Sequence, residues 1–142
     1  PGAVLWVFKN FPLQMHPQAP AAAVAGECAA EQGRFFDMHH LLFETQDDWS
    51  VTNPDPVLAG LAAQLEMDSA AFEACLSSRQ ALERVLVDLF EGQASVRSTP
   101  TFFFLFDGGG TGVEGTRDPA DFAAILETQL EAAIEAAATR TP

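Results

Sequence analysis

The sequence predicts an α/β protein in which helices cover an open β-sheet that a multi-helix insert interrupts. Two continuous apolar runs, residues 3–8 and 102–106, lack polar alternation, so each is predicted to be a strand covered on both faces. Between them, over residues 18–94, apolar side chains recur at helical spacing. A chain of 142 residues is long enough to build its own core, and we predict a single domain.

Charge and composition exclude several classes of function. The chain carries 20 acidic and 7 basic side chains, giving a formal net charge of −13, and the basic residues are scattered singly. Nucleic acids and anionic membranes bind clusters of basic residues, so we expect neither as a partner. We interpret the acidic side chains as solvated helix surface. No apolar stretch has the length of a membrane span, which argues against membrane insertion.

The predicted insert begins after the first strand, where Phe11-Pro12-Leu13 leads to His16-Pro17. Five helices are expected, over residues 18–31, 34–46, from 55 onward, from 68 onward and 80–94, with a connection at residues 47–54. Gly33 is expected to end the first helix, and Asp55 and Asp68 are interpreted as caps of the third and fourth. The fifth carries the clearest apolar stripe: Leu82, Val85, Leu86, Leu89 and Phe90.

The loop at Ser98-Thr99-Pro100 leads into the second apolar strand. Proline has no N–H to donate to a sheet, so Pro100 is expected at the mouth of the strand and not within it. The residue before a proline avoids the helical region, so Thr99 is expected to be extended. We expect the Thr99-Pro100 peptide bond to be cis.

A hairpin and a last helix are predicted after this strand. Residues 107–110, Asp-Gly-Gly-Gly, supply the positive-φ positions of a turn, and residues 111–115 form a returning edge strand. Asp118 and Pro119 begin the last helix. This helix is expected to bury Phe122, Ile125, Leu126, Leu130, Ala133 and Ile134.

The cysteines and histidines give no metal or cofactor site by their spacing. His16, His39 and His40 match no zinc pattern, so we expect no metal and no cofactor. Cys28 and Cys75 each lie on an apolar helical face, and we favour two free cysteines packed as small hydrophobic side chains. A structural disulfide between them remains the alternative, because the sequence alone does not establish the required Cβ geometry.

Five motifs, in this order, resemble the DsbA-like branch of the thioredoxin superfamily. They are Phe11-Pro12-Leu13 after a strand, His16-Pro17 before an Ala-rich helix, the segment Cys28-Ala29-Ala30-Glu31-Gln32-Gly33-Arg34-Phe35-Phe36-Asp37-Met38-His39, Phe72-Glu73-Ala74-Cys75-Leu76, and Ser98-Thr99-Pro100-Thr101-Phe102-Phe103. The resemblance covers essentially the whole chain. It implies a thioredoxin-like part over residues 1–14 and 96–142 and a helical insert over residues 15–95.

This resemblance implies a protein thiol-disulfide oxidoreductase, but the sequence lacks the family's redox pair. The family's Cys-x-x-Cys begins its first helix, after its first strand, whereas Cys28 and Cys75 are 47 positions apart (75 − 28). By the same resemblance, Ser98, Thr99 and Pro100 bind an extended peptide or protein substrate. DsbA-like proteins usually work outside the cytoplasm, so we expect a periplasmic or other extracytoplasmic location.

Two functional hypotheses follow. In the first, these residues are the C-terminal portion of a DsbA-like oxidoreductase whose N-terminal strand and Cys-x-x-Cys helix lie upstream, so that the chain as given is inactive. In the second, the chain is a redox-inactive thioredoxin-fold module that binds peptides or proteins. No residue specifically supports a glutathione-using isomerase. If the chain begins at residue 1, the strand at residues 3–8 would lack a neighbour, and we then expect self-association through the truncated sheet.

Overall fold

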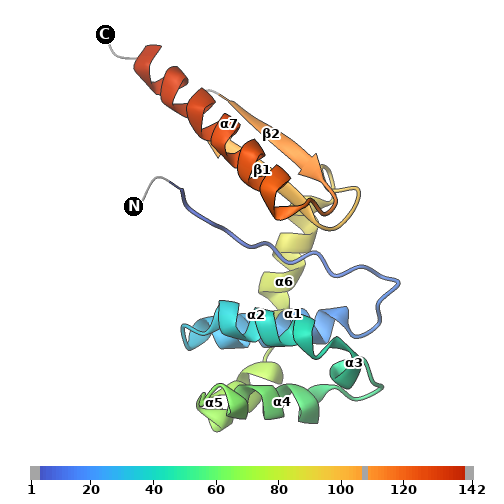
Figure 1. Cartoon of the computed structure of the whole chain (residues 1–142). Helices are drawn as coiled ribbons and strands as arrows, with labels where there is room; N and C mark the ends of the chain where they lie inside the picture. The colour runs from blue at the N-terminus through green and yellow to red at the C-terminus, as the bar shows by residue number, and fades with distance from the viewer. Residues whose placement is uncertain (1–3, 107–108, 140–142) are drawn as a thin grey trace. The chain divides into compact units, whose positions relative to one another are not determined.

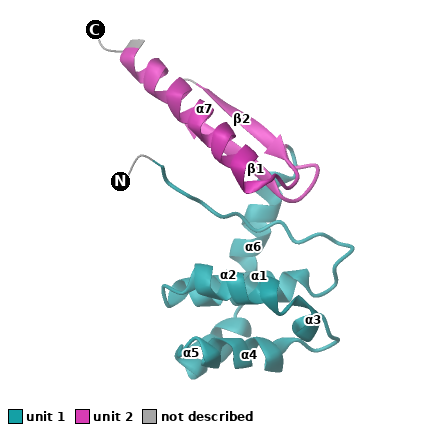
Figure 2. Cartoon of the chain, viewed as in Figure 1, with its two compact units in different colours: residues 1–94 teal, residues 95–142 magenta. Residues whose placement is uncertain are grey.

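The computed structural model describes residues 4–106 and 109–139, and the chain divides into two compact units between Ala94 and Ser95 (Figures 1 and 2). We call residues 4–94 the helical unit and residues 95–139 the hairpin unit. The division falls next to residues 95 and 96, where the sequence predicts the insert to end, but residues 4–14, predicted to belong to the thioredoxin-like part, group with the helices. That the whole chain is one domain stays a prediction.

The helical unit contains six helices. They are α1 (Ala19–Glu31), α2 (Phe35–Glu44), α3 (Gln46–Trp49), α4 (Asp55–Gln64), α5 (Ser69–Leu76) and α6 (Arg79–Gly92). Helix α1 is central, because it packs against α2, α4, α5 and α6. The chain turns from α1 into α2 at Gly33, whose φ of +71° lies in the left-handed region that glycine adopts without a Cβ penalty.

Side-chain caps fix where two of these helices begin. As predicted, Asp68 caps α5: its Oδ1 accepts a hydrogen bond of 3.0 Å from the backbone N–H of Ala71. The Ser78 hydroxyl accepts one from the backbone N–H of Ala81 at the start of α6. Asp55, in contrast, is the first residue of α4 and caps nothing with its side chain, so its expected role was wrong. The predicted connection at residues 47–54 is also partly helical, since α3 reaches Trp49.

The fully packed core of the described residues lies in the helical unit. Every buried apolar residue falls between Ala22 and Val85. The largest fully buried side chains are those of Phe72, Met38, Leu58, Val85 and Cys28. The apolar stripe of α6 is only partly used, because Val85 is buried while Phe90 is 76% exposed.

The strand predicted at residues 3–8 does not form over residues 4–8, and residue 3 lies outside the described residues. Residues 4–8 have no regular secondary structure, and Leu5 is 87% exposed. A strand requires a neighbouring backbone to satisfy its N–H and C=O groups. Within the described part of the chain, the one sheet contains only β1 and β2, so this segment has no partner strand there.

The hairpin unit consists of β1 (Thr101–Phe106), β2 (Gly109–Glu114) and α7 (Pro119–Thr139). The strands are antiparallel, in a register that runs from Thr101 opposite Glu114 to Phe106 opposite Gly109. Asp118 begins α7 by accepting a hydrogen bond of 2.9 Å from the backbone N–H of Ala120. Of the predicted turn residues 107–110, the first two lie outside the described residues, and the other two belong to β2.

Within the hairpin unit, only one face of β1 is covered. Phe102 and Phe104 pack on Phe122 of α7, with ring centroids 4.8 and 5.7 Å apart. On the opposite face Phe103 is 49% exposed and Leu105 is 80% exposed. The expectation of a strand covered on both faces was therefore wrong for this unit, because one helix can cover only one face of a two-stranded sheet.

The last helix is longer than the strands it covers. A 21-residue helix spans about 31 Å, whereas a six-residue strand spans about 20 Å. Phe122, Ile125, Leu126, Leu130 and Ala133 are half-buried. Ile134, predicted to be buried, is 62% exposed, which is expected where a helix extends past the strands it packs on.

Candidate functional site: a cis-proline loop and an aromatic cleft

The loop predicted to bind substrate lies at the start of β1. The Thr99-Pro100 peptide bond is cis, as predicted. Two hydrogen bonds hold the loop on either side of this bond: the Thr101 hydroxyl donates to the Ser98 carbonyl at 2.6 Å, and the Gly115 N–H donates to the Pro100 carbonyl at 2.7 Å. The Ser98 hydroxyl also lies 3.4 Å from a Glu114 carboxylate oxygen.

Thr99 is an exposed residue of this loop. Thr99 and Pro100 are exposed, whereas Ser98 is half-buried. Within residues 4–106 and 109–139, Thr99 makes no hydrogen bond through its backbone N–H or C=O. The ladder of the hairpin begins two residues later, at Thr101. The loop therefore offers one donor and one acceptor to a chain lying alongside it.

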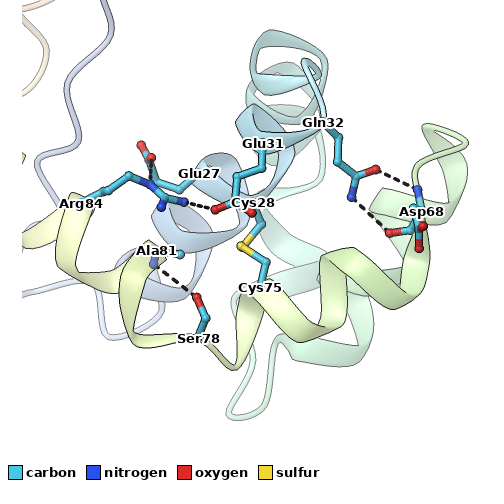
Figure 3. The surroundings of a disulfide bond; sticks show 9 residues. All are labelled: Glu27, Cys28, Glu31, Gln32, Asp68, Cys75, Ser78, Ala81 and Arg84. Carbon is cyan, nitrogen blue, oxygen red and sulfur yellow. Dashed lines mark hydrogen bonds and ion pairs between the residues drawn. A yellow bond between two sulfur atoms is a disulfide. The ribbon is translucent and has the colours of Figure 1, made fainter.

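The two cysteines form a disulfide in the helical unit (Figure 3). The S–S distance is 2.05 Å and the Cα atoms are 5.6 Å apart, so the interpretation of two free cysteines was wrong. Helix α5 packs against α1, and this tertiary contact brings together two cysteines that are 47 positions apart in the sequence. Cys28 is 1% exposed and Cys75 6%, which shields the bond from attacking thiolates.

Polar pairs near the disulfide join the end of α1 to the start of α5, and α1 to α6. The Gln32 side chain donates to the Asp68 carbonyl at 3.1 Å and accepts from the Asp68 N–H at 2.8 Å. Arg84 of α6 donates to Glu27 at 2.9 Å and to Glu31 at 2.6 Å, both on α1 (Figure 3). These contacts fix α1 against its neighbours around the covalent link.

The N-terminal segment is anchored by a second polar cluster. Asn10 is 5% exposed; its side-chain amide donates to Glu27 at 2.7 Å, and its backbone N–H donates to Asp88 at 2.9 Å. Lys9 pairs with the same Asp88 carboxylate at 2.8 Å and with Glu91 at 3.1 Å. The pKa of Lys9 is raised, mainly by the hydrogen bond to Asp88 and secondly by the one to Glu91. The segment around Asn10 is thereby tied to both α1 and α6.

This anchored segment forms one wall of a cleft of about 350 Å³, whose other walls come from α1, α2 and α3. The ring centroid of Phe8 lies 5.1 Å from that of Phe35 and 4.9 Å from that of His39. The ring centroids of His39 and Phe43 are 4.9 Å apart. Trp49 closes the cleft; its indole N–H donates to the Leu42 carbonyl at 2.8 Å. The cleft is therefore lined by aromatic ring faces and edges.

Two further features define the chemistry of this cleft. Gly26 lets the Phe35 ring approach α1 closely, since a Cβ at that position would lie 3.3 Å from the ring. Burial, and secondarily the charge of neighbouring His40, lowers the pKa of His39. The imidazole of His39 is consequently uncharged at neutral pH.

The sequence interpretation missed this cleft. Phe35, His39 and Phe43 recur at four-residue spacing, which predicts a shared helix face but not what that face meets. Among the residues that the structure describes, no group of three or more His, Cys, Asp or Glu side chains is placed to hold a metal ion. No helix of the described residues is long and apolar enough to cross a membrane.

Comparison with known proteins supports the resemblance. A family model described as "Thioredoxin" matches residues 1–128. The chain belongs to this thioredoxin-fold, DsbA-like family. Membership confirms the predicted fold class, and the structure contributes the mixed helices and antiparallel hairpin. No solved structure gives a significant match.

Several curated relatives are much longer proteins. A Na(+)/H(+) antiporter NhaA 3 of Salinispora tropica is 38% identical over 103 residues, which are 71% of this chain and 15% of the relative. A Na(+)/H(+) antiporter NhaA 1 of Mycolicibacterium vanbaalenii is 38% identical over 104 residues, 70% of this chain and 16% of the relative. A Na(+)/H(+) antiporter NhaA of Herminiimonas arsenicoxydans is 37% identical over 116 residues, 81% and 17% respectively. The matched region is thus 15–17% of the length of these three relatives.

Proposed function

We propose that these residues are the C-terminal portion of a DsbA-like protein thiol-disulfide oxidoreductase, in which Ser98, Thr99 and Pro100 hold the backbone of an extended peptide or protein substrate. The observation that carries this proposal is that Thr99 is exposed and that its backbone N–H and C=O make no hydrogen bond among the described residues. It suits the pairing by which an extended chain adds to the end of a sheet. Membership of the thioredoxin-fold family supports the same assignment.

The redox pair would have to lie outside these 142 residues. In thiol-disulfide exchange a thiolate attacks one sulfur of a substrate disulfide, a mixed disulfide forms, and the other substrate sulfur leaves as a thiolate. The sequence contains two cysteines, and both are consumed in the buried bond between Cys28 and Cys75. The chain alone is therefore expected to bind substrate without exchanging disulfides.

Peptide binding tests the substrate-loop assignment. A fluorescein-labelled unfolded peptide with alkylated cysteines is titrated with the protein, and anisotropy reports binding without covalent exchange. Thr99→Pro removes the backbone N–H and should weaken binding about tenfold, equivalent to one hydrogen bond of about 1.4 kcal/mol. Thr99→Ala keeps that N–H and should bind like the wild type. Equal binding by Thr99→Pro, with the hairpin amide signals intact by NMR, contradicts the proposal.

The cysteine content of the native protein separates the two functional hypotheses. Under both of them, the 142-residue chain should not catalyse insulin reduction. The intact mass of the protein from its native source, denatured and alkylated after reduction, should reveal cysteines additional to Cys28 and Cys75. Peptide binding without any further cysteine pair in the native protein would instead support a redox-inactive thioredoxin-fold binding module.

We also propose an extracytoplasmic location, because structural disulfides persist in oxidising compartments and are rare in the cytosol. The buried bond between Cys28 and Cys75 supports this location. Alkylation of intact cells before lysis should leave both cysteines unlabelled until a reductant is added. Labelling of both without reductant contradicts the proposal. The antiport activity in the relatives' names belongs to proteins matched over 15–17% of their length, and we do not extend it to this chain.

Self-association is a further proposal about partners. The uncovered face of β1, with Phe103 and Leu105, supports it, because exposed apolar strand surface promotes association. Sedimentation velocity should show concentration-dependent dimers that Leu105→Lys abolishes. A monomer at every concentration up to millimolar contradicts it.

A further inference from the structure

The aromatic cleft of the helical unit is built on a rigid frame. Its outer wall, the segment from Phe8 to Pro12, is anchored by the buried Asn10, which bonds to Glu27 on α1 and Asp88 on α6. Its inner wall is α1, which the disulfide at Cys28 cross-links to α5. The cleft is therefore held open by fixed elements on both sides, a property shared by preformed small-molecule sites.

The size of the cleft limits what it can hold. A volume of about 350 Å³ lies near the lower end of the range of roughly 300–1,000 Å³ typical of ligand pockets. This space suits a molecule of one or two rings. Phe43, on the rim, is 69% exposed, so a bound ligand would cover apolar surface that now faces water.

The lining determines the charge of a suitable ligand. No Asp, Glu, Lys or Arg is among the described residues that line the cleft, although the whole chain carries a charge of −13. Apart from the imidazoles of His16 and His39, the lining offers a charged ligand no ionic partner to offset its lost hydration. Aromatic ring faces and edges instead favour another ring in stacked or edge-to-face contact. Gln18, Gln46 and Ser50, also in the lining, supply side chains that can hydrogen-bond a hydroxyl or amide substituent.

We propose that this cleft is a binding site for a small, uncharged aromatic molecule of one or two rings. The uncharged imidazole of His39, next to Phe8, Phe35 and Phe43, contributes one wall of the ring-binding part. The site does not depend on the substrate-binding role of the Pro100 loop, because all its lining residues belong to the helical unit.

The first experiment compares three ligands that share one ring and differ in charge: phenylacetamide, phenylacetate and phenethylamine. Each is titrated into the isotope-labelled protein, and NMR shifts of the His39 and Phe43 side chains report binding. Phenylacetamide should bind at least tenfold more tightly than either charged analogue. Equal or tighter binding of the cation or the anion overturns the proposal, as does an absence of saturable shifts with all three.

A fourth ligand distinguishes a free molecule from a peptide side chain. N-acetylphenylalanine amide presents the same ring attached to a backbone. A small-molecule site should bind it more weakly than phenylacetamide, because the backbone groups need room at a cleft of limited volume. Tighter binding of the capped amino acid would show that the cleft docks an aromatic side chain of a polypeptide, and it would overturn the proposal.

Matched variants locate the binding. Phe43→Ala removes a wall, and Ala23→Leu fills the cleft from α1; each should weaken phenylacetamide binding at least tenfold. Phe36→Ala is the control, since Phe36 is also an exposed phenylalanine of α2 but does not line the cleft. Because the Phe43 side chain is largely exposed, the Phe43→Ala variant should stay folded, as judged by its amide NMR spectrum. An equal loss of binding with Phe36→Ala, or unchanged binding with both cleft variants, contradicts the assigned site.

Discussion

The helical unit and the hairpin unit differ in how completely they bury their apolar side chains. The helical unit packs α1 against four other helices and encloses the whole set of fully buried apolar residues that the structure describes. The hairpin unit places one helix on one face of two strands, and its phenylalanines remain at best half-buried. Two-stranded sheets need additional layers for independent stability. The comparison indicates that most of the packing energy, and all of the cross-linking, belongs to the helical unit.

Equivalent truncations in the two units should show the largest difference. Phe72 is 0% exposed, so Phe72→Ala should lower the free energy of unfolding by close to the upper end of about 3–5 kcal/mol. Phe122→Ala removes a half-buried ring and should cost about 1–2 kcal/mol, consistent with its smaller buried area. Urea unfolding of both variants measures the difference; if Phe72→Ala unfolds outright, Phe72→Leu gives the graded value. Equal losses would mean that the units are equally packed.

Removing the disulfide should affect the helical unit alone. Closing a loop between residues 47 positions apart stabilises the folded chain by about 4 kcal/mol on loop-entropy grounds. The double variant Cys28→Ala with Cys75→Ala should lose a comparable amount. Hydrogen exchange should then accelerate in α1 and α5 and remain unchanged in β1 and β2. A uniform acceleration across both units would show that they unfold together.

The polar anchor of the N-terminal segment should contribute less. Asp88→Ala removes the acceptor for Lys9 and for the buried Asn10, and we expect a loss of about 1–3 kcal/mol, mostly from Asn10 groups left without a partner. Glu91→Ala is the matched control; Glu91 is 57% exposed and pairs only at the surface, so its loss should be near zero. Urea titration and amide shifts of residues 8–12 distinguish the two. Equal losses of stability in Asp88→Ala and Glu91→Ala would show that the hydrogen bonds of Asn10 to Asp88 contribute nothing beyond a surface ion pair.

The smallest expected effect is a pH dependence confined to the aromatic cleft. Burial lowers the pKa of His39 from its ordinary 6.5, so below pH 6.5 the unfolded chain takes up a proton that the folded chain resists. Stability should therefore fall as the pH drops through 6.5 toward the lower folded pKa, and be unaffected above that window. Thermal melts of His39→Gln should lose this dependence. His40→Gln, which alters an exposed neighbour, should keep most of it; the reverse result would assign the effect to His40.

Much of the local structure followed from the sequence. Periodicity located five of the six helices of the helical unit, and Asp68, Gly33 and Asp118 marked helix ends through backbone chemistry that acts within a few residues. Five motifs indicated the DsbA-like family, which the family comparison confirms. The roles of Ser98, Thr99 and Pro100 in substrate binding, and the absence of a metal or cofactor, stay predictions.

The tertiary structure decided what depends on contacts between distant residues. Residues 4–8 have strand-like composition but form no strand, because a strand needs a neighbouring strand and the described residues provide none for this segment. The sequence pattern of a segment does not show whether such a neighbour is present. The bond between Cys28 and Cys75, the anchoring of Asn10 by Glu27 and Asp88, and the gathering of Phe8 with Phe35 and His39 all join separate helices or segments. Sequence spacing records which face of a helix a side chain occupies. Only tertiary packing determines which helix faces contact one another. Both the disulfide and the aromatic cleft depend on such contacts between separate helices.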